Sequence, residues 1–315
     1  MFTGLSLDAR MPYTQQWNAS FQFLLPGQIS VTSAYVGSKG TKLQGRSDVN
    51  LPLPGDGNVD ARRPLPQFQA VRLLETKYNS SYQAAQLTAE RRFGTSLGFQ
   101  LAYTWSHAID VLSSETGILS LDPRNVNLDR GNALWDLRHR LSASWSYQLP
   151  FRSRGALNHL VGGWQVNGIL SLYTGFFFTV TSSVNTLNTG GGNRPDGLRN
   201  AQLPRNEQTL QRWFDTSAFT PPGFRQFGTT GRDTLSGPGT RQLDASLFKQ
   251  FFFSESHQRR LEFRAEFFNL SNTPQFNNPA ATFGAQGFGI ISSAGSPVTL
   301  QRTPRQVQFG LKFYF

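Results

Sequence analysis

The chain has 315 residues, of which 30 are lysine or arginine and 19 are aspartate or glutamate, so its formal net charge is +11. Only 16% of the residues are charged, below the roughly 25% usual in soluble domains, while 13% are aromatic, including 27 phenylalanines. The absence of cysteine excludes disulfides, Cys-ligated zinc and a thiol nucleophile, and no run of about 18 apolar residues is present to form a membrane-spanning helix.

Alternation of apolar and polar residues is the main pattern along the chain. It predicts about nine β-strands, each with two chemically different faces. In chain order, the predicted strands cover residues 17–23, 29–35, 85–90, 97–105, 141–149, 164–172, 242–247, 261–267 and 307–315.

The connections between these strands alternate between short and long. The short ones lie at residues 25–28, 92–95, 150–163 and 254–257. The long ones are rich in Gly, Pro, Asn, Asp, Ser and Thr and run roughly over residues 37–80, 107–138, 175–240 and 271–304. In an antiparallel meander, successive connections lie at opposite ends. The pattern therefore places every short turn at one end and every long loop at the other, a layout typical of outer-membrane barrels.

We therefore predict an all-β fold, an antiparallel up-and-down transmembrane β-barrel segment of about 9–12 strands. The competing interpretation is a soluble β-sandwich that binds carbohydrate, with its apolar faces packed together. Strand length favours the barrel, since several strands alternate over about nine or more residues, close to the length that crosses a membrane. Aromatic residues near strand ends, such as Trp17, Trp105 and Trp164, also fit an interfacial girdle.

The strand at 261–267 illustrates the two predicted faces. Its apolar residues alternate with three charged ones, which are Glu262, Arg264 and Glu266. The carboxylates invite interpretation as a general acid and base, but on a barrel wall they form a charged row facing the lumen. We predict that all three residues face the lumen.

Several segments resemble the C-terminal half of TonB-dependent outer-membrane receptors, especially the large Oar-like group. They are YQAAQLTAERRF (82–93), LGFQLAYTWSHAID (97–110), DLRHRL (136–141), GGWQVNGILSLYTGFFFTV (162–180), NRPD (193–196), LEFRAEFFNLSN (261–272), NNP (277–279) and FGLKFYF (309–315). The resemblance implies a place in the outer membrane within a 22-stranded barrel. It also implies an N-terminal plug and import of a scarce ligand with energy from an inner-membrane complex.

The organisation expected from this resemblance is a single region, residues 1–315, that forms the C-terminal portion of such a barrel. No plug domain, energy-coupling box or signal peptide is recognisable in the sequence, so we expect a receptor fragment whose plug and remaining barrel wall are encoded elsewhere. The implied partners are outer-membrane lipid and lipopolysaccharide, the barrel-assembly machinery, the missing plug and barrel half, and the energy-coupling complex. A passive channel or an adhesive barrel is the alternative function.

Little in the sequence indicates catalysis or a cofactor. His107, His139, His159 and His257 lie far apart without metal-ligand spacing, so we predict no metal site. The segment TGGGNR at 189–194 lacks the strand–helix context and the lysine of a phosphate-binding loop, and we predict a flexible loop tip there. Basic residues form no stripe of the kind that binds nucleic acid. We predict no enzyme, no cofactor and no nucleic-acid partner.

The last residues of the chain alternate cleanly up to a terminal aromatic residue. Phe309, Leu311, Phe313 and Phe315 are all apolar and share one parity. A terminal strand of this kind resembles the C-terminal signal that the outer-membrane assembly machinery recognises. We therefore predict that these four residues form an assembly signal.

Deleting Phe315 from the full protein should lower its yield in the outer membrane without altering the other strands, because the assembly machinery would lose the terminal aromatic side chain. The measurement is the amount of protein in purified outer membranes, with total synthesis as the control. Equal yields with and without Phe315 would contradict the predicted signal.

Overall fold

The computed structural model describes residues 2–92, 96–114, 120–151, 157–184, 186–253, 259–295 and 304–315, apart from the side chains of Asn158 and His159. These residues form a mostly antiparallel 11-stranded sheet whose main path follows the chain order. The path consists of β2 (Tyr13–Leu25), β3 (Ile29–Asp48), β4 (Val71–Arg91), β5 (Leu97–Asp110), β7 (His139–Gln148), β8 (Trp164–Tyr173), β14 (Thr240–Phe252), β15 (Arg260–Phe268) and β17 (Gln306–Tyr314).

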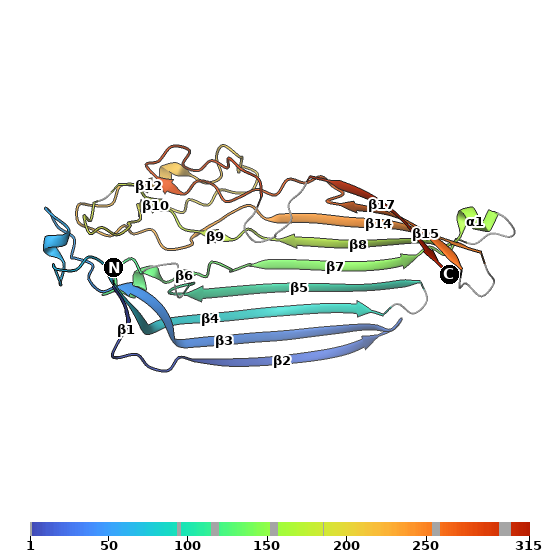
Figure 1. Cartoon of the computed structure of the whole chain (residues 1–315), viewed down its shortest axis with the longest axis horizontal. Helices are drawn as coiled ribbons and strands as arrows, with labels where there is room; N and C mark the ends of the chain where they lie inside the picture. Colours follow the sequence, from blue (N-terminus) through green and yellow to red (C-terminus); the bar gives the residue numbers. More distant parts are fainter. Residues whose placement is uncertain are drawn as a thin grey trace.

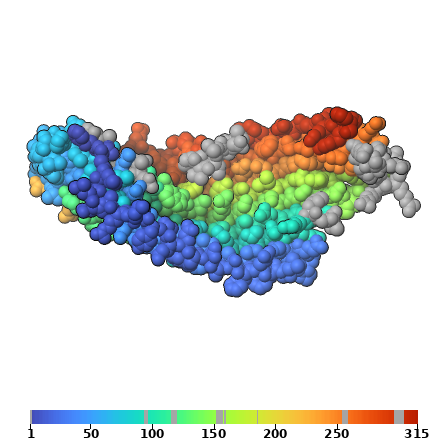
Figure 2. All heavy atoms as spheres, turned by 60° about the horizontal axis from the view of Figure 1, so that its bottom comes forward, coloured from blue at the N-terminus to red at the C-terminus, as the bar shows by residue number. Residues whose placement is uncertain are grey.

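The sheet confirms each predicted strand and the up-and-down topology. Long loops gather at one end and short turns at the other, and the C-terminus lies at the short-turn end (Figure 1). The space-filling view shows a continuous wall in which the colours change in sequence order across the strands (Figure 2). Within the described residues, β2 and β17 are the edges of the sheet. No described helix is long and apolar enough to cross a membrane.

Two strands extend well beyond their predicted ends. β3 continues to Asp48 and β4 begins at Val71. The loop between them is therefore shorter than the predicted loop over residues 37–80. The register between these strands shifts after Gly40 and again after Leu43. Such irregularities interrupt strict alternation, which is why the period-two pattern did not reveal the outer halves. Two short strands flank this region, β1 (Phe2–Leu5), which is parallel to β4, and β6 (Gly131–Asn132), which pairs with β5.

Strand register divides the side chains between two faces. Residues directly opposite each other in an antiparallel pair point to the same side. Phe263 pairs with Leu311, whereas Arg264 pairs with Gly310 and Phe248. The same parity continues across the sheet and places most apolar side chains on one side, the apolar face. The opposite side, the polar face, carries a hydrogen-bonded row that includes Ser146 and Asn167, joined at 2.7 Å.

On the apolar face, two tryptophans lie flat against glycines of the neighbouring strand. Trp145 pairs with Gly168, and Trp17 pairs with Gly37. A Cβ atom added at Gly168 would lie 2.1 Å from Cζ2 of Trp145, and one at Gly37 would lie 2.3 Å from the Trp17 ring. The missing side chains therefore make room for the indoles, a packing that compensates for the weak β-propensity of glycine.

The long loops have a hydrophobic core of their own. The connection between β8 and β14 contains β9 (Phe177–Phe178), β10 (Thr181–Ser182), β11 (Asp196–Gly197), β12 (Phe219–Thr220) and β13 (Leu235–Ser236). β10 pairs with β16 (Thr282–Phe283) from the connection between β15 and β17. Phe214 is fully buried at the centre of this core, and its ring contacts those of Phe178, Phe219 and Phe288.

Phe263→Arg should lower the free energy of unfolding by roughly 2–4 kcal/mol, because a guanidinium would enter the hydrocarbon near the middle of β15. Gln308→Arg is the matched control, since it adds the same group on the polar face directly opposite Glu266. The control should change the free energy by less than about 1 kcal/mol. Urea unfolding of the full protein in lipid vesicles measures both, and equal losses would contradict the assignment of the faces.

Candidate functional site

The long-loop end contains a cavity of about 580 Å³, which we call the loop cavity. It lies between the ends of β3 and β4, the loop that joins them, and the loops that follow β5, β8 and β15. Its lining includes four arginines and three aspartates, an excess of one positive charge. These residues are Arg63, Arg72, Arg194, Arg232, Asp48, Asp129 and Asp233.

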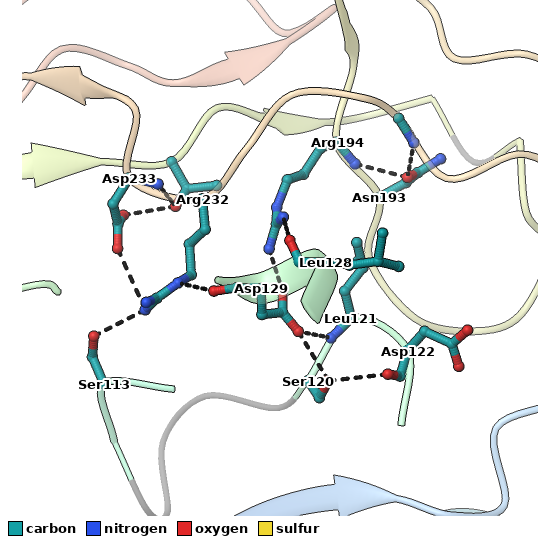
Figure 3. Close-up of polar contacts among 12 residues, drawn as sticks. Ser113, Ser120, Leu121, Asp122, Leu128, Asp129, Asn193, Arg194, Arg232 and Asp233 are labelled. Carbon is teal, nitrogen blue, oxygen red and sulfur yellow. Dashed lines mark hydrogen bonds and ion pairs between the residues drawn. The ribbon is translucent and has the colours of Figure 1, made fainter. Parts of the chain in front are cut away.

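Arg232 connects the loop cavity to the body of the sheet. It is only 5% exposed. Its Nε donates to the Asp129 carbonyl at 2.7 Å, and its Nη1 donates to Ser113 at 2.9 Å. Its guanidinium also forms an ion pair with Asp110, the last residue of β5. A second ion pair joins it to Asp233 (Figure 3). One side chain therefore fixes the long β8–β14 loop to β5 and the loop after it.

Arg194 makes a second connection of the same kind. Its guanidinium pairs with the Asp129 carboxylate and donates to the Leu128 carbonyl at 2.7 Å. The second oxygen of Asp129 accepts from the Leu121 N–H at 2.7 Å and from the Ser120 hydroxyl at 2.9 Å (Figure 3). We call Asp110, Asp129, Arg194, Arg232 and Asp233 the arginine–aspartate network. Its charges are buried but paired, as a stable low-dielectric site requires.

Burial raises the pKa of the Asp233 carboxyl above its ordinary value, and the nearby Asp110 charge acts in the same direction. The hydrogen bond from Thr179 at 2.7 Å and the Arg232 charge oppose this shift. Asp233 also has a positive φ of 51°, a conformation that aspartate adopts more readily than most residues. The backbone at this point turns sharply so that the carboxylate can enter the network.

Arg72 differs from the other arginines of the loop cavity. Its Nε is shielded from water and has no hydrogen-bond partner among the described residues. Arg63, by contrast, is bonded to Asp60 at 2.7 Å and to the Asn50 carbonyl at 3.0 Å. A buried donor without a partner is costly. Among the arginines that line the cavity, Arg72 is therefore the one whose buried Nε still lacks an acceptor in the described residues.

The glycine segment predicted to be a flexible loop tip lies at this cavity. Gly190, Gly191 and Gly192 line it, whereas the flanking residues Thr189 and Asn193 are buried. Asn193 donates to the Thr186 hydroxyl and to the Gln226 carbonyl. The prediction was wrong for the flanks of this segment, because contacts with distant loop residues hold them in place.

Two long loops are also joined to each other beside the cavity. The Asn188 side chain donates to the carbonyls of Gly55 and Gly57, each at 2.9 Å. Arg62 donates to the Asn188 carbonyl, and Arg225 pairs with Asp56. The β3–β4 loop is thereby held against the β8–β14 loop.

The three residues predicted to face the lumen share the polar face of β15. Arg264 Nε lies 2.5 Å from the Glu262 carboxylate, which also accepts from Gln250 at 2.9 Å. Glu266 lines a groove of about 600 Å³ on the same face, with Gln100, Ser144, Asn167 and Asp244 among its neighbours. Glu262 and Glu266 therefore have different surroundings, although their exposure to a lumen stays a prediction.

The four residues of the predicted assembly signal lie on or next to β17. Phe309, Leu311 and Phe313 point to the apolar face and are largely exposed, and Phe315 is 97% exposed beyond the strand. The Phe309 ring stacks on Phe263 with centroids 6.1 Å apart. Their exposure leaves them accessible to another protein, and their role in assembly stays a prediction.

The side chains of His107 and His139 have different hydrogen-bond partners. His107 contacts Asn132 at 3.3 Å and His139 contacts Tyr103 at 2.8 Å. The His159 side chain and His257 lie outside the described residues. In the part of the chain that the structure describes, no group of three or more His, Asp or Glu side chains is arranged to hold a metal ion.

A family model described as "Outer membrane beta barrel domain" matches residues 1–308. The chain belongs to the outer membrane beta barrel domain family. The nine-strand meander is accordingly part of an outer membrane barrel wall, and the protein is located in the outer membrane. A search of curated proteins found no match.

Several solved outer membrane proteins align with most of this chain. The outer membrane transporter YddB from Escherichia coli aligns with a TM-score of 0.53 and 9% identity, over 99% of this chain and 34% of YddB. Fiu, a ferric-catecholate import receptor from E. coli, gives 0.47 and 10% over 98% of this chain and 29% of Fiu. The FrpB iron transporter from Neisseria meningitidis gives 0.47 and 10% over 100% and 32%. This outer membrane barrel chain thus spans about a third of the length of these proteins.

Arg232→Gln should destabilise the packed loops of the barrel by roughly 3–5 kcal/mol, because it leaves buried carboxylates without their cation. Arg225→Gln removes an arginine of the same loop whose ion pair with Asp56 is exposed, and should cost less than about 1 kcal/mol. Hydrogen exchange of the loop amides measures both effects. Similar exchange rates in the two variants would contradict a structural role for the arginine–aspartate network.

Proposed function

We propose that the chain forms the C-terminal part of the wall and the outer loops of a TonB-dependent outer-membrane receptor that takes up a scarce ligand. The Oar-like group is the proposed subgroup. In this proposal the plug and the remaining strands belong to regions outside residues 1–315, and an inner-membrane complex supplies the energy. The role is transport and recognition, without catalysis. Lipopolysaccharide surrounds the loop end, and the barrel-assembly machinery handles the terminal strand.

The observation that carries this proposal is the loop cavity. Outer-membrane barrels carry their long loops on the extracellular side, so a cavity between packed loops is open to ligands from outside the cell. A passive pore needs no such cavity, whereas a receptor for a dilute solute needs a preformed site. The fold shared with the transporter YddB is consistent with transport.

We infer an anionic ligand from the one unsatisfied arginine donor in the cavity lining. The carboxylates of the network already balance Arg194 and Arg232, and Arg63 has its own acidic partners. Arg72 retains an unsatisfied buried donor. A carboxylate, phosphate or anionic metal chelate would supply the missing acceptor, and a hydrogen bond between charged groups contributes about 1.5–3 kcal/mol.

Uptake measurements on cells producing the full protein test the proposal. The probes are radiolabelled ferric citrate, a ferric catecholate and a phosphorylated sugar. We expect at least one probe to accumulate in an energy-dependent manner, so that a protonophore abolishes uptake. Uptake that persists with the protonophore and rises linearly with concentration would instead support the passive channel.

Arg72→Gln should raise the half-saturating concentration of the transported probe by roughly 10- to 150-fold. This range corresponds to the loss of one charged hydrogen bond. Arg205→Gln removes the same charge from an exposed position of the β8–β14 loop outside the cavity and should leave the value unchanged. If both variants behave like the original protein, the loop cavity is not the ligand site.

A further inference from the structure

The connection between β7 and β8 forms a short apolar projection at the short-turn end. It contains α1 (Asn158–Val161), which extends past the ends of the strands (Figure 1). Leu157, Leu160 and Val161 are all exposed, Leu160 by 67%. We call residues 157–163 the rim segment. Three exposed aliphatic side chains on one turn are unusual for a segment surrounded by water.

A lysine on the apolar face contacts the rim segment. Lys249 of β14 lies directly opposite Trp164 of β8 and Phe263 of β15, so its parity is that of the apolar face. It is only 2% exposed. Its ammonium group lies 5.4 Å from the centroid of the Trp164 ring and 4.9 Å from that of Phe251, and it donates a hydrogen bond to the Gly162 carbonyl.

Three features hold the rim segment on this side of the sheet, one of them a side-chain hydrogen bond. The Trp164 indole N–H donates to the Leu160 carbonyl at 2.9 Å. The Gly163 carbonyl accepts from the Gln250 N–H at 3.0 Å. Gly163 has a φ of +74°, and a Cβ there would lie 2.6 Å from the Gln250 carbonyl oxygen, so only glycine permits this turn. The turn brings the Gly162 carbonyl onto the apolar face.

We propose that the rim segment lies in the interfacial layer of the phospholipid leaflet at the short-turn end, with Leu157, Leu160 and Val161 directed into the acyl chains. The segment is continuous with the apolar face, which meets the hydrocarbon of the outer membrane. Apolar side chains that enter the boundary between headgroups and acyl chains add membrane affinity in proportion to the apolar area they bury. Lys249 is a positioning residue, because its ammonium holds the Gly162 carbonyl and thereby keeps the segment on the lipid side.

Spin labels on the full protein in vesicles of phosphatidylethanolamine and phosphatidylglycerol test this inference. Residues 1–315 contain no cysteine, so Leu160→Cys adds a single labelling site to this region. We expect a label at 160 to collide with oxygen several-fold more, relative to a water-soluble nickel reagent, than a label at Ile169→Cys. Ile169 is similarly exposed but has the parity of the polar face. Phe309→Cys serves as the lipid-exposed reference on the apolar face.

The outcome at position 160 decides the proposal. A nickel-accessible label there, matching the label at 169, would overturn it. A label that is aqueous in vesicles but immobilised in native outer membranes would indicate a protein partner instead and would also overturn it. Lys249→Met should move the label at 160 toward water while the label at 309 is unchanged. Continued lipid contact at 160 in this variant would contradict the positioning role of Lys249.

Discussion

Complete pairing of backbone hydrogen-bonding groups is the constraint on which this structure depends. The hydrocarbon of a membrane offers no hydrogen-bond partners, so a sheet that crosses it must have an unbroken ladder. The pairing of β3 with β4 runs without a shift from Ile29↔Arg91 to Gly40↔Ser80, and its irregularities begin only beyond Gly40. The pairing of β4 with β5 ends at the same level, at Ser80↔Asp110. Among the described strands, register shifts thus occur only on the long-loop side.

Beyond Gly40, Ser80 and Asp110, contacts between side chains hold the long loops in place where the regular backbone ladder ends. Arg232 satisfies its donors with groups from the end of β5, from the loop after it and from its own loop. The phenylalanines around Phe214 exclude water nearby. Gly131 approaches the Arg232 backbone so closely that a Cβ would lie 2.2 Å from its carbonyl oxygen. Packing of this kind keeps a cavity open between loops that have little regular structure, and it leaves Arg72 as the donor within the cavity that lacks an acceptor.

The sequence predicted the membrane-crossing part well, because that part obeys a local rule. Alternation such as Leu97, Phe99 and Leu101 against Gly98 and Gln100 is visible within a few residues, and turn signals such as Pro26-Gly27 mark the ends. The loop site follows no local rule. Arg232 and Asp110 are 122 positions apart, and the buried ends of the Thr189–Arg194 segment depend on residues such as Gln226. The sequence signal for this site was the pair Arg232-Asp233 in a glycine-rich loop. That pair does not identify the distant residues that Arg232 contacts.

The direction of the edge strands has a consequence for closure of the barrel. β2 and β17 are separated by eight antiparallel steps along the main path, an even number, so they run in the same direction. If two copies of this sheet were joined edge to edge with their loops on the same side, β17 of one would lie parallel to β2 of the other, contrary to the all-antiparallel pairing of such barrels. An odd number of additional strands restores alternation at both edges. Strand parity therefore excludes self-assembly as a route to a fully antiparallel ring and restricts which complementary segments can complete the wall.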